Sequence, residues 1–213
     1  AGVFAPLLLR AIGHEVVELY TKPDATFPNH VPDPEDPYVM QDLSKKVLEV
    51  GADLGIGLDA DGDRFGCVDE KGEYVNSDKV ILLLAKDALS RHPGSQVLYD
   101  VKCSRILEKL IKEYGGNPLM HVTGHANIKQ SLRDNPNIIL GGEMSGHLFF
   151  VENYFKIDDA LYASAKILDL ISNQSRPYSE LFTDIPATVM TPEIKLPCLD
   201  SQKQQVVKDI SRF

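Results

Sequence analysis

Short apolar segments typical of β-strands alternate along this chain with longer segments that have the apolar spacing of helices. The patterns predict helices that begin near residues 5, 39, 77, 104, 126 and 158, and strands at 15–20, 54–58, 65–68, 73–75, 97–101, 119–122, 138–140 and 148–151. Alternation of this kind is typical of α/β proteins. We therefore predict two consecutive α/β units with mixed, largely parallel sheets, divided between residues 72 and 77.

The 213-residue chain has the composition of an ordinary globular protein, and its length corresponds to one or two domains. Its 31 acidic residues outnumber its 22 basic residues, which argues against general binding to nucleic acid or to anionic membranes. No apolar run approaches the roughly 18 residues that a membrane span needs. Cys67, Cys103 and Cys198 are too scattered for a disulfide framework or a zinc site, so we predict a cytoplasmic location.

Three aspartates, Asp59, Asp61 and Asp63, follow directly after one of the apolar strands. Alternate residues of an extended backbone point the same way, so we expect the three carboxylates to converge, with a turn at Gly62. Carboxylates this close repel one another, and a hard divalent cation is their natural counterion. The other interpretation of the segment is a charged surface turn.

Arg64 ends the acidic loop and narrows the choice of ligand. It stands where the calcium loop of an EF-hand needs glycine, so that motif is excluded. A guanidinium beside a metal site favours an anion, because a phosphate can contact both the cation and the arginine fork. Mg²⁺ with a phosphorylated ligand is therefore the leading hypothesis for this loop.

Polar side chains also follow three strands predicted in the second unit. Lys102 follows one strand, His125 follows the next, and a glycine-rich loop carries Glu143, Ser145 and His147. Because ligands of α/β proteins bind at the carboxyl ends of the strands, this recurrence favours a shared site. A carboxylate and a hydroxyl suit sugar hydroxyls, and a histidine exchanges protons near neutral pH. Taken alone, each loop could instead be an ordinary connecting turn.

The joint pattern resembles the α-D-phosphohexomutases, the phosphomannomutase/phosphoglucomutase family. Residues 59–64 are similar to the family's DGDGDR metal loop, with Ala60 in place of the first glycine. Residues 143–147 are similar to its GEMSGH sugar loop, and residues 100–103 and 123–129 resemble adjoining substrate segments in the family's order. The resemblance covers nearly the whole chain.

The resemblance implies a role for each of these residues. The metal ligands would be Asp59, Asp61 and Asp63, which would bind Mg²⁺ together with a phosphoserine oxygen. The catalytic residues would be His147, Lys102 and Arg64, with His147 or Lys102 transferring the proton and Arg64 contacting a phosphoryl group or the phosphoserine. The substrate-binding residues would be Glu143, Ser145, His147, His125, Lys102 and Lys129. Glu143 and Ser145 would hold sugar hydroxyls.

Members of the family have four domains around a central cleft, so the resemblance also implies an organisation. Residues 1–74 resemble a metal-binding domain 2 without its opening strand, residues 75–186 resemble a sugar-binding domain 3, and residues 187–213 resemble the start of domain 4. The TASHNP serine loop of domain 1 has no counterpart here. We therefore expect a fragment whose missing partners are domains 1 and 4 of the parent chain.

The activity implied for the parent protein is that of a Mg²⁺-dependent isomerase. Such an enzyme interconverts hexose 1-phosphate and hexose 6-phosphate, of mannose, glucose or both, through the phosphoserine and a hexose bisphosphate intermediate. We expect the fragment alone to be inactive. The alternatives are a non-catalytic module that binds metal and sugar phosphate, and a metal-dependent phosphatase with Asp59 or Asp61 as nucleophile.

Overall fold

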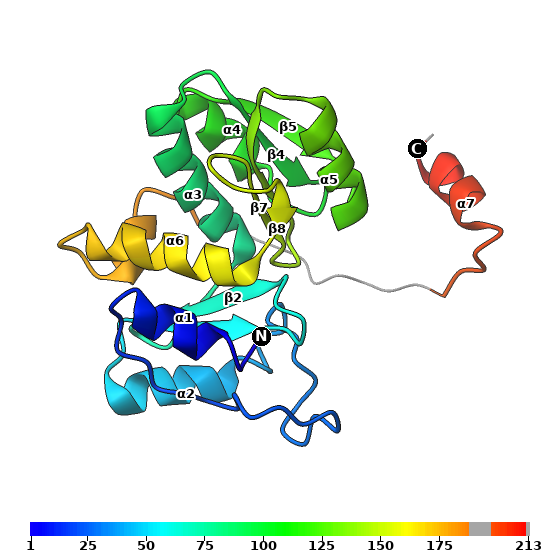
Figure 1. Cartoon of the computed structure of the whole chain (residues 1–213). Helices are drawn as coiled ribbons and strands as arrows, with labels where there is room; N and C mark the ends of the chain where they lie inside the picture. Colours follow the sequence, from blue (N-terminus) through cyan, green and yellow to red (C-terminus); the bar gives the residue numbers. More distant parts are fainter. Residues whose placement is uncertain (188–196, 212–213) are drawn as a thin grey trace.

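The computed structural model describes residues 1–187 and 197–211 of the chain. Figure 1 shows two α/β units packed against each other. Helices α1 (Ala5–Ala11) and α6 (Ala160–Ser172) lie side by side where the units meet. The first unit contains the acidic loop, and the second contains the other polar loops singled out from the sequence.

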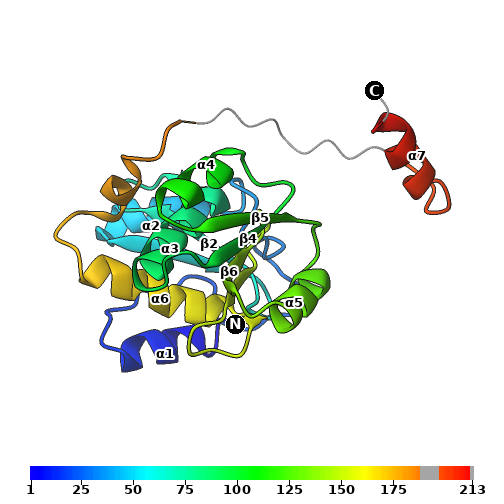
Figure 2. The same cartoon turned by 90° about the horizontal axis from the view of Figure 1, so that it is seen from above.

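The C-terminal segment contains helix α7 (Lys203–Ile210), none of whose residues is buried. Figure 2 shows α7 apart from both units. Residues 188–196, which belong to the segment expected to resemble the start of domain 4, lie outside the described residues. Within the described part of the chain, no helix combines the length and the apolar character needed to cross a membrane.

The first unit is a small antiparallel sheet with two helices. The order of its strands is β1 (Leu54–Leu58), β2 (Phe65–Asp69) and β3 (Tyr74–Val75). Each pair is antiparallel because short turns join the strands. Helix α2 (Gln41–Val50) packs Val47 against Val68 of the sheet. The helix ends where Gly51 takes a left-handed conformation with φ of 65°.

The second unit is a mixed sheet in the order β5-β4-β6-β7-β8. Its strands are β4 (Gln96–Asp100), β5 (Asn117–His121), β6 (Ile138–Gly142), β7 (Leu148–Phe150) and β8 (Ile157–Asp158). Its helices are α3 (Ser77–Arg91), α4 (Ile106–Glu113), α5 (His125–Asp134), α6 and the 3-10 helix η1 (Tyr178–Phe182). Strand β4 pairs in parallel with β5 and β6 because helices connect these strands, whereas short loops make β6, β7 and β8 antiparallel.

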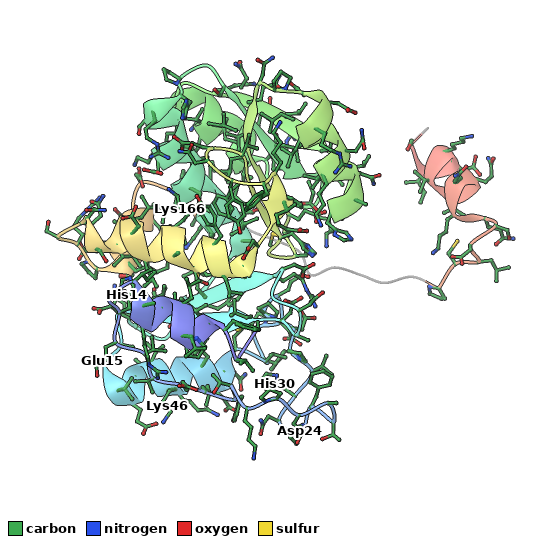
Figure 3. All side chains as sticks on the ribbon, viewed as in Figure 1. His14, Glu15, Asp24, His30, Lys46 and Lys166 are labelled. Atoms are coloured by element: carbon green, nitrogen blue, oxygen red, sulfur yellow. The ribbon has the colours of Figure 1, made fainter. Side chains whose placement is uncertain are left out.

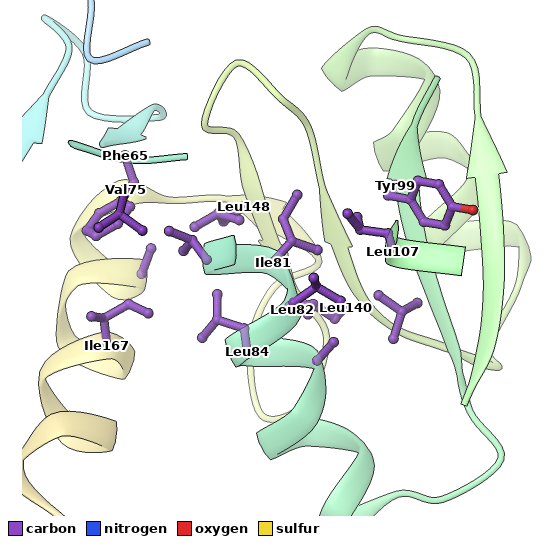
Figure 4. Close-up of a cluster of buried hydrophobic side chains, with 14 of the residues drawn as sticks. Phe65, Val75, Ile81, Leu82, Leu84, Tyr99, Leu107, Leu140, Leu148 and Ile167 are labelled. Carbon is purple, nitrogen blue, oxygen red and sulfur yellow. The ribbon is translucent and has the colours of Figure 1, made fainter. Parts of the chain in front are cut away.

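One hydrophobic core runs from the first unit into the second. Phe65 and Val75 of the first sheet belong to the same buried cluster as Ile81 of α3, Leu148 of β7 and Ile167 of α6. Figure 4 shows these side chains filling the space between α3 and α6. The two units are therefore held together by apolar surface that neither of them could bury alone.

The predicted fold class of two α/β units with mixed sheets is confirmed, but the expectation that the sheets are largely parallel is wrong: among the described strands only β4 pairs in parallel, with β5 and β6. The strand predicted at 15–20 is wrong: the segment pairs with no strand of the described residues. Instead, Arg10 holds it through Val16 O at 3.0 Å and Glu18 at 2.8 Å. Glu15 lies on the outer surface of the first unit (Figure 3). A strand-like composition forms a strand only where a neighbour supplies backbone partners.

Glu152, on the loop after β7, joins the second sheet to the end of α3. Its carboxylate lies 2.9 Å from Arg91 Nη2 and 2.8 Å from His92 Nε2. Hydrogen bonds from Arg91 and His92 lower the pKa of Glu152 from 4.5 to about 2. Because the folded-state pKa is lower than the unfolded-state pKa, this stabilisation is complete above pH 4.5 and is lost as the pH falls toward 2.

We expect Glu152→Gln to lower the free energy of unfolding by about 1 kcal/mol at pH 7, because partly exposed ion pairs contribute little more. The difference from wild type is expected to shrink as the pH falls below 4.5. Urea denaturation at pH 7 and at about pH 3 measures both values. Glu180→Gln, on the exposed surface of η1, is the control. A difference of equal size at both pH values would contradict the prediction.

Candidate active site

The metal loop, which is the acidic loop of residues 59–64 between β1 and β2, carries the three predicted metal ligands. Asp59, the first residue after β1, is buried. Its Oδ1 accepts hydrogen bonds from the backbone N–H groups of Gly62 at 2.9 Å, Asp63 at 3.1 Å and Arg64 at 3.2 Å. Gly62 has φ of 85°, a left-handed conformation that favours glycine at this turn. Asp59 therefore folds the loop back around its own carboxylate.

The loop brings the carboxylates of Asp59, Asp61 and Asp63 together, with one oxygen of each within 4.8 Å of the others. Burial and the hydrogen bond with Asp59 raise the pKa of Asp63. Burial opposes ionisation of Asp59, but hydrogen bonds from Arg64 lower its pKa. Carboxylate oxygens at this spacing suit a divalent cation such as Mg²⁺, whose charge would offset the repulsion between them.

Arg64 is held between two carboxylates. Its Nε donates to Asp59 Oδ2 at 2.8 Å, and its Nη1 donates to Asp33 Oδ1 at 3.0 Å. Burial alone would lower the pKa of Arg64, but hydrogen bonding with Asp59 raises this pKa overall. The side chain stays 28% exposed. The guanidinium is thus fixed beside the metal loop and remains accessible to an anionic ligand.

Backbone contacts join the metal loop to the glycine-rich loop between β6 and β7. Phe65 N donates to Gly146 O at 3.0 Å, and Arg64 and His147 form an antiparallel bridge. On the other side of the loop, the N–H group of Ala160, the first residue of α6, donates to Gly62 O at 2.9 Å. The metal loop and the glycine-rich loop therefore form one site, although they come from different units.

His147 belongs to the glycine-rich loop, and its side chain lies between Glu143 of that loop and Asp63 of the metal loop. Its Nδ1 is 2.8 Å from Ser145 Oγ and 3.1 Å from Glu143 Oε2, and its Nε2 is 3.5 Å from Asp63 Oδ2. Burial opposes protonation, but hydrogen bonding with Glu143 and the charge of Asp63 raise the pKa of His147. Since the Glu143 carboxylate accepts, Nδ1 carries a proton toward it. Nε2 is then the atom that gains or loses a proton beside the metal loop.

Glu143 ties the glycine-rich loop to the loop before α5. Its carboxylate is buried, and Oε1 accepts a hydrogen bond from Gly124 N at 2.6 Å. Burial opposes ionisation, but the hydrogen bond with His147 lowers the pKa of Glu143. One carboxylate therefore orients His147 and positions the start of α5 at the same time.

Helix α5 presents His125 and Lys129 one turn apart on the side of the site. The ring of His125 stacks on that of His147, with the centroids 5.5 Å apart. Lys129 Nζ lies 2.6 Å from Asp158 Oδ1 and 3.2 Å from His125 Nδ1. Asp63, His125 and Asp158 also offer ligand atoms within 4.8 Å of one another, but Lys129 already supplies positive charge to this group.

The structure brings nine of the predicted residues into one connected group: Asp59, Asp61, Asp63, Arg64, His125, Lys129, Glu143, Ser145 and His147. Lys102 lies on the loop after β4 and extends toward the first unit, with Nζ 3.8 Å from Glu35 Oε1. The roles of Lys102 and of the nine grouped residues in binding and catalysis stay predictions.

Two carboxylates of the site, Asp33 and Asp158, were not predicted from the sequence. Asp33 comes from the long segment between α1 and α2, and nothing in its spacing points to Arg64. For Asp158 there was a signal, the adjacent pair of aspartates before α6. Asp159 caps this helix by accepting from Leu161 N and Tyr162 N, both at 2.9 Å. A second aspartate at a helix start is not needed for capping, so it is a candidate for another task.

Two family models match the chain. The model of phosphoglucomutase/phosphomannomutase alpha/beta/alpha domain II matches residues 1–72, and the model of domain III matches residues 76–189. The chain belongs to this family. The resemblance to the α-D-phosphohexomutases is thereby confirmed. The domain borders that we placed after residues 74 and 186 stay predictions.

Curated relatives and a solved structure agree with this family assignment. The phosphomannomutase/phosphoglucomutase of Pseudomonas syringae is 43% identical over 212 residues, which are 100% of this chain and 45% of that protein. That of Pseudomonas aeruginosa is 42% identical, over 100% of this chain and 46% of that protein. This chain thus spans about half the length of the curated relatives it matches. A phosphoglucomutase/phosphomannomutase family protein from Burkholderia thailandensis aligns with a TM-score of 0.86 and 43% identity, over 90% of this chain and 42% of that one.

Proposed function

We propose that the protein is a Mg²⁺-dependent phosphohexomutase acting on the phosphates of glucose, mannose or both. In this proposal residues 1–74 form the metal-binding domain and residues 75–186 form the sugar-binding domain. The protein is proposed to act in the cytoplasm. The phosphoserine comes from a domain not contained in this sequence, so the chain alone does not turn over substrate. The observation that carries the proposal is the backbone hydrogen bond between Phe65 and Gly146, which joins the metal loop to the glycine-rich loop.

The reaction transfers a phosphoryl group twice. The phosphorus–oxygen bond of the phosphoserine breaks while a hexose hydroxyl forms a new bond to phosphorus. The proton of that hydroxyl passes through a base of the site to the departing serine oxygen, so the products are a hexose bisphosphate and a free serine. After the sugar turns round, its other phosphoryl group returns to the serine and the proton goes back to the sugar oxygen. Such transfers depend on positioning and on stabilisation of the charge spread over the phosphoryl oxygens.

The residues of the site suit these steps. When bound by Asp59, Asp61 and Asp63, Mg²⁺ supplies positive charge to the phosphoryl oxygens. Arg64, held in direction by Asp59 and Asp33, contacts the same anionic group. His147 accepts the hydroxyl proton at Nε2, because Glu143 holds its Nδ1. Lys102 is the second candidate for this proton transfer.

The second unit supplies the groups that recognise the sugar phosphate. Glu143 and Ser145 offer a carboxylate and a hydroxyl to the sugar hydroxyls. Next to them, the stacked ring of His125 offers a hydrogen-bond donor and the ammonium group of Lys129 offers positive charge to a phosphate. A hexose phosphate could therefore contact both groups within one site.

Calorimetry with Mg²⁺, glucose 1-phosphate, mannose 1-phosphate and inorganic phosphate tests the proposal on this chain. We expect Asp61→Asn to weaken Mg²⁺ binding at least about tenfold, because the variant loses a charged ligand. Glu143→Gln is expected to weaken hexose phosphate more than inorganic phosphate, because only the hexose has hydroxyls. Unchanged Mg²⁺ affinity in Asp61→Asn, or absence of hexose phosphate binding in wild type, would overturn the proposed site.

A turnover assay separates this proposal from the alternatives. Binding without turnover by this chain is expected, and turnover by the chain alone would contradict the proposed source of the phosphoserine. If the complete protein also binds hexose phosphate without turnover, the non-catalytic binding module is the better description. A phosphatase mechanism is disfavoured because it would give no role to the glycine-rich loop that docks onto the three aspartates. Trapping a phosphoryl group on Asp59 or Asp61 would reverse that conclusion.

A further inference from the structure

Asp100, the last residue of β4, is a fully buried carboxylate at the centre of the loops described above. Strand β4 is the middle strand of the parallel part of the sheet, between β5 and β6. Its carboxyl end therefore lies at the edge where the loops after all three strands begin. Asp100 takes no part in the metal, sugar or phosphate contacts proposed for the site, and a buried carboxylate is costly unless donors satisfy it.

Three donors from three different loops satisfy this carboxylate. Met144 N, in the glycine-rich loop, donates to Oδ1 at 3.1 Å. Cys103 Sγ, in the loop after β4, donates to the same oxygen at 3.0 Å. Thr123 Oγ1, in the loop after β5, donates to Oδ2 at 2.9 Å. Burial raises the pKa of the Cys103 thiol, so Cys103 keeps the proton that it donates.

Each of these donors is a close sequence neighbour of a proposed ligand-binding residue. Met144 lies between Glu143 and Ser145, which are proposed to hold the sugar. In the other two loops, Cys103 follows Lys102, the second candidate for the proton transfer, and Thr123 lies two residues before His125, which is proposed to bind the phosphate. Moving any one loop would therefore displace its ligand-binding side chain relative to the other two.

We propose that Asp100 is a positioning residue, which fixes the spacing between the glycine-rich loop and the loops that carry Lys102 and His125, so that one hexose phosphate reaches all three. The inference rests on the proposed function for the identity of the ligand. An aspartate suits this task because it accepts at both oxygens and can serve three donors at once. Glu143, which holds Gly124, joins two of the same loops, whereas Asp100 joins all three.

The test uses Thr123→Val, Thr123→Ser and Asp100→Ala. Thr123→Val removes one donor at an exposed position, so it is expected to leave the fold intact, and Thr123→Ser keeps the hydroxyl. Asp69→Ala is the matched control, because Asp69 is also a buried aspartate that accepts from two backbone N–H groups, those of Lys71 and Glu73, but at the far end of β2. This control separates a loss of affinity caused by lower stability from one caused by displaced loops.

Two measurements are made on each variant. The first is the affinity for glucose 1-phosphate and for inorganic phosphate, by calorimetry. We expect Thr123→Val to weaken glucose 1-phosphate about tenfold, since one hydrogen bond to a charged group is lost, and to weaken inorganic phosphate less than about threefold. Thr123→Ser is expected to restore wild-type affinity, and Asp69→Ala to retain it. The second is hydrogen exchange at the Met144 amide, which is expected to be faster in Thr123→Val and in Asp100→Ala.

The outcomes distinguish this inference from the proposed function. If wild type binds neither compound, the proposed function fails, and exchange at Met144 alone decides whether Asp100 braces the loops. Unchanged exchange in Thr123→Val would overturn the bracing role. Equal losses for glucose 1-phosphate and inorganic phosphate would also overturn it, because coupling between sugar and phosphate loops predicts unequal losses. A failure of Thr123→Ser to restore binding would do the same.

Discussion

Gly146→Ala is expected to separate the metal loop from the glycine-rich loop and to destabilise the protein by at least about 3 kcal/mol. Gly146 has φ of 93°, and a Cβ added there would lie 2.5 Å from Phe65 O. That carbonyl is main chain and belongs to the strand that follows the metal loop, so it cannot turn away as a side chain would. Chemical denaturation measures the loss of stability, and Mg²⁺ titration measures the effect on the site.

Gly115→Ala is the matched control for this prediction. Gly115 also has a positive φ, of 81°, but no atom lies within 4 Å of a Cβ added there. Its substitution is expected to cost only the backbone strain of an alanine in a left-handed conformation, about 1 kcal/mol. If the two variants lose equal stability, the steric contact at Phe65 is not what makes glycine necessary at position 146.

Asp59→Ala is expected to abolish measurable Mg²⁺ binding and to lower the free energy of unfolding by about 3 kcal/mol. The substitution removes a proposed metal ligand and also the acceptor of three backbone N–H groups and of the guanidinium of Arg64. Because Asp59 is buried, water cannot fully replace these bonds. Arg64 would also lose the carboxylate that holds its Nε.

Asp61→Ala separates the two contributions of the loop. Asp61 is exposed, and its removal relieves repulsion between carboxylates, so stability is expected to change by less than about 0.5 kcal/mol. Its Mg²⁺ affinity is nevertheless expected to fall, as in Asp61→Asn. Thermal unfolding with and without Mg²⁺ provides the measurement, since only a variant that binds the ion is stabilised by it. A Mg²⁺-dependent shift in Asp59→Ala as large as in wild type would contradict the assignment.

The features predicted correctly from the sequence are those encoded by neighbouring residues. Helix α2 was predicted because Val39, Leu43 and Val47 recur at helical spacing and Gly51 supplies the left-handed residue at its end. The convergence of Asp59, Asp61 and Asp63 was likewise predictable, because their spacing and Gly62 lie within one short segment. Local patterns carried both predictions.

The features that were missed depend on residues far apart in the chain. Arg64 meets Asp33 across 31 positions, and Asp100 meets Met144 across 44, with no periodicity to connect them. The predicted strand at 15–20 failed for the same reason, since strand formation depends on a partner that its own composition cannot supply. Family resemblance placed the loops in one site, but it did not indicate which buried carboxylates support them.

The hydrophobic core shared by the two units bears on how the site meets its ligand. Phe65 and Val75 are packed together with Ile81, Leu148 and Ile167, so a hinge between the units would have to expose this apolar surface to water. The carboxylates of Asp59, Asp61 and Asp63 and the glycine-rich loop are consequently preorganised, and their relative placement does not have to be established when a ligand arrives. Ligand binding therefore carries no entropy cost for bringing these two loops together. More of the free energy of the ligand's contacts is then expressed as affinity.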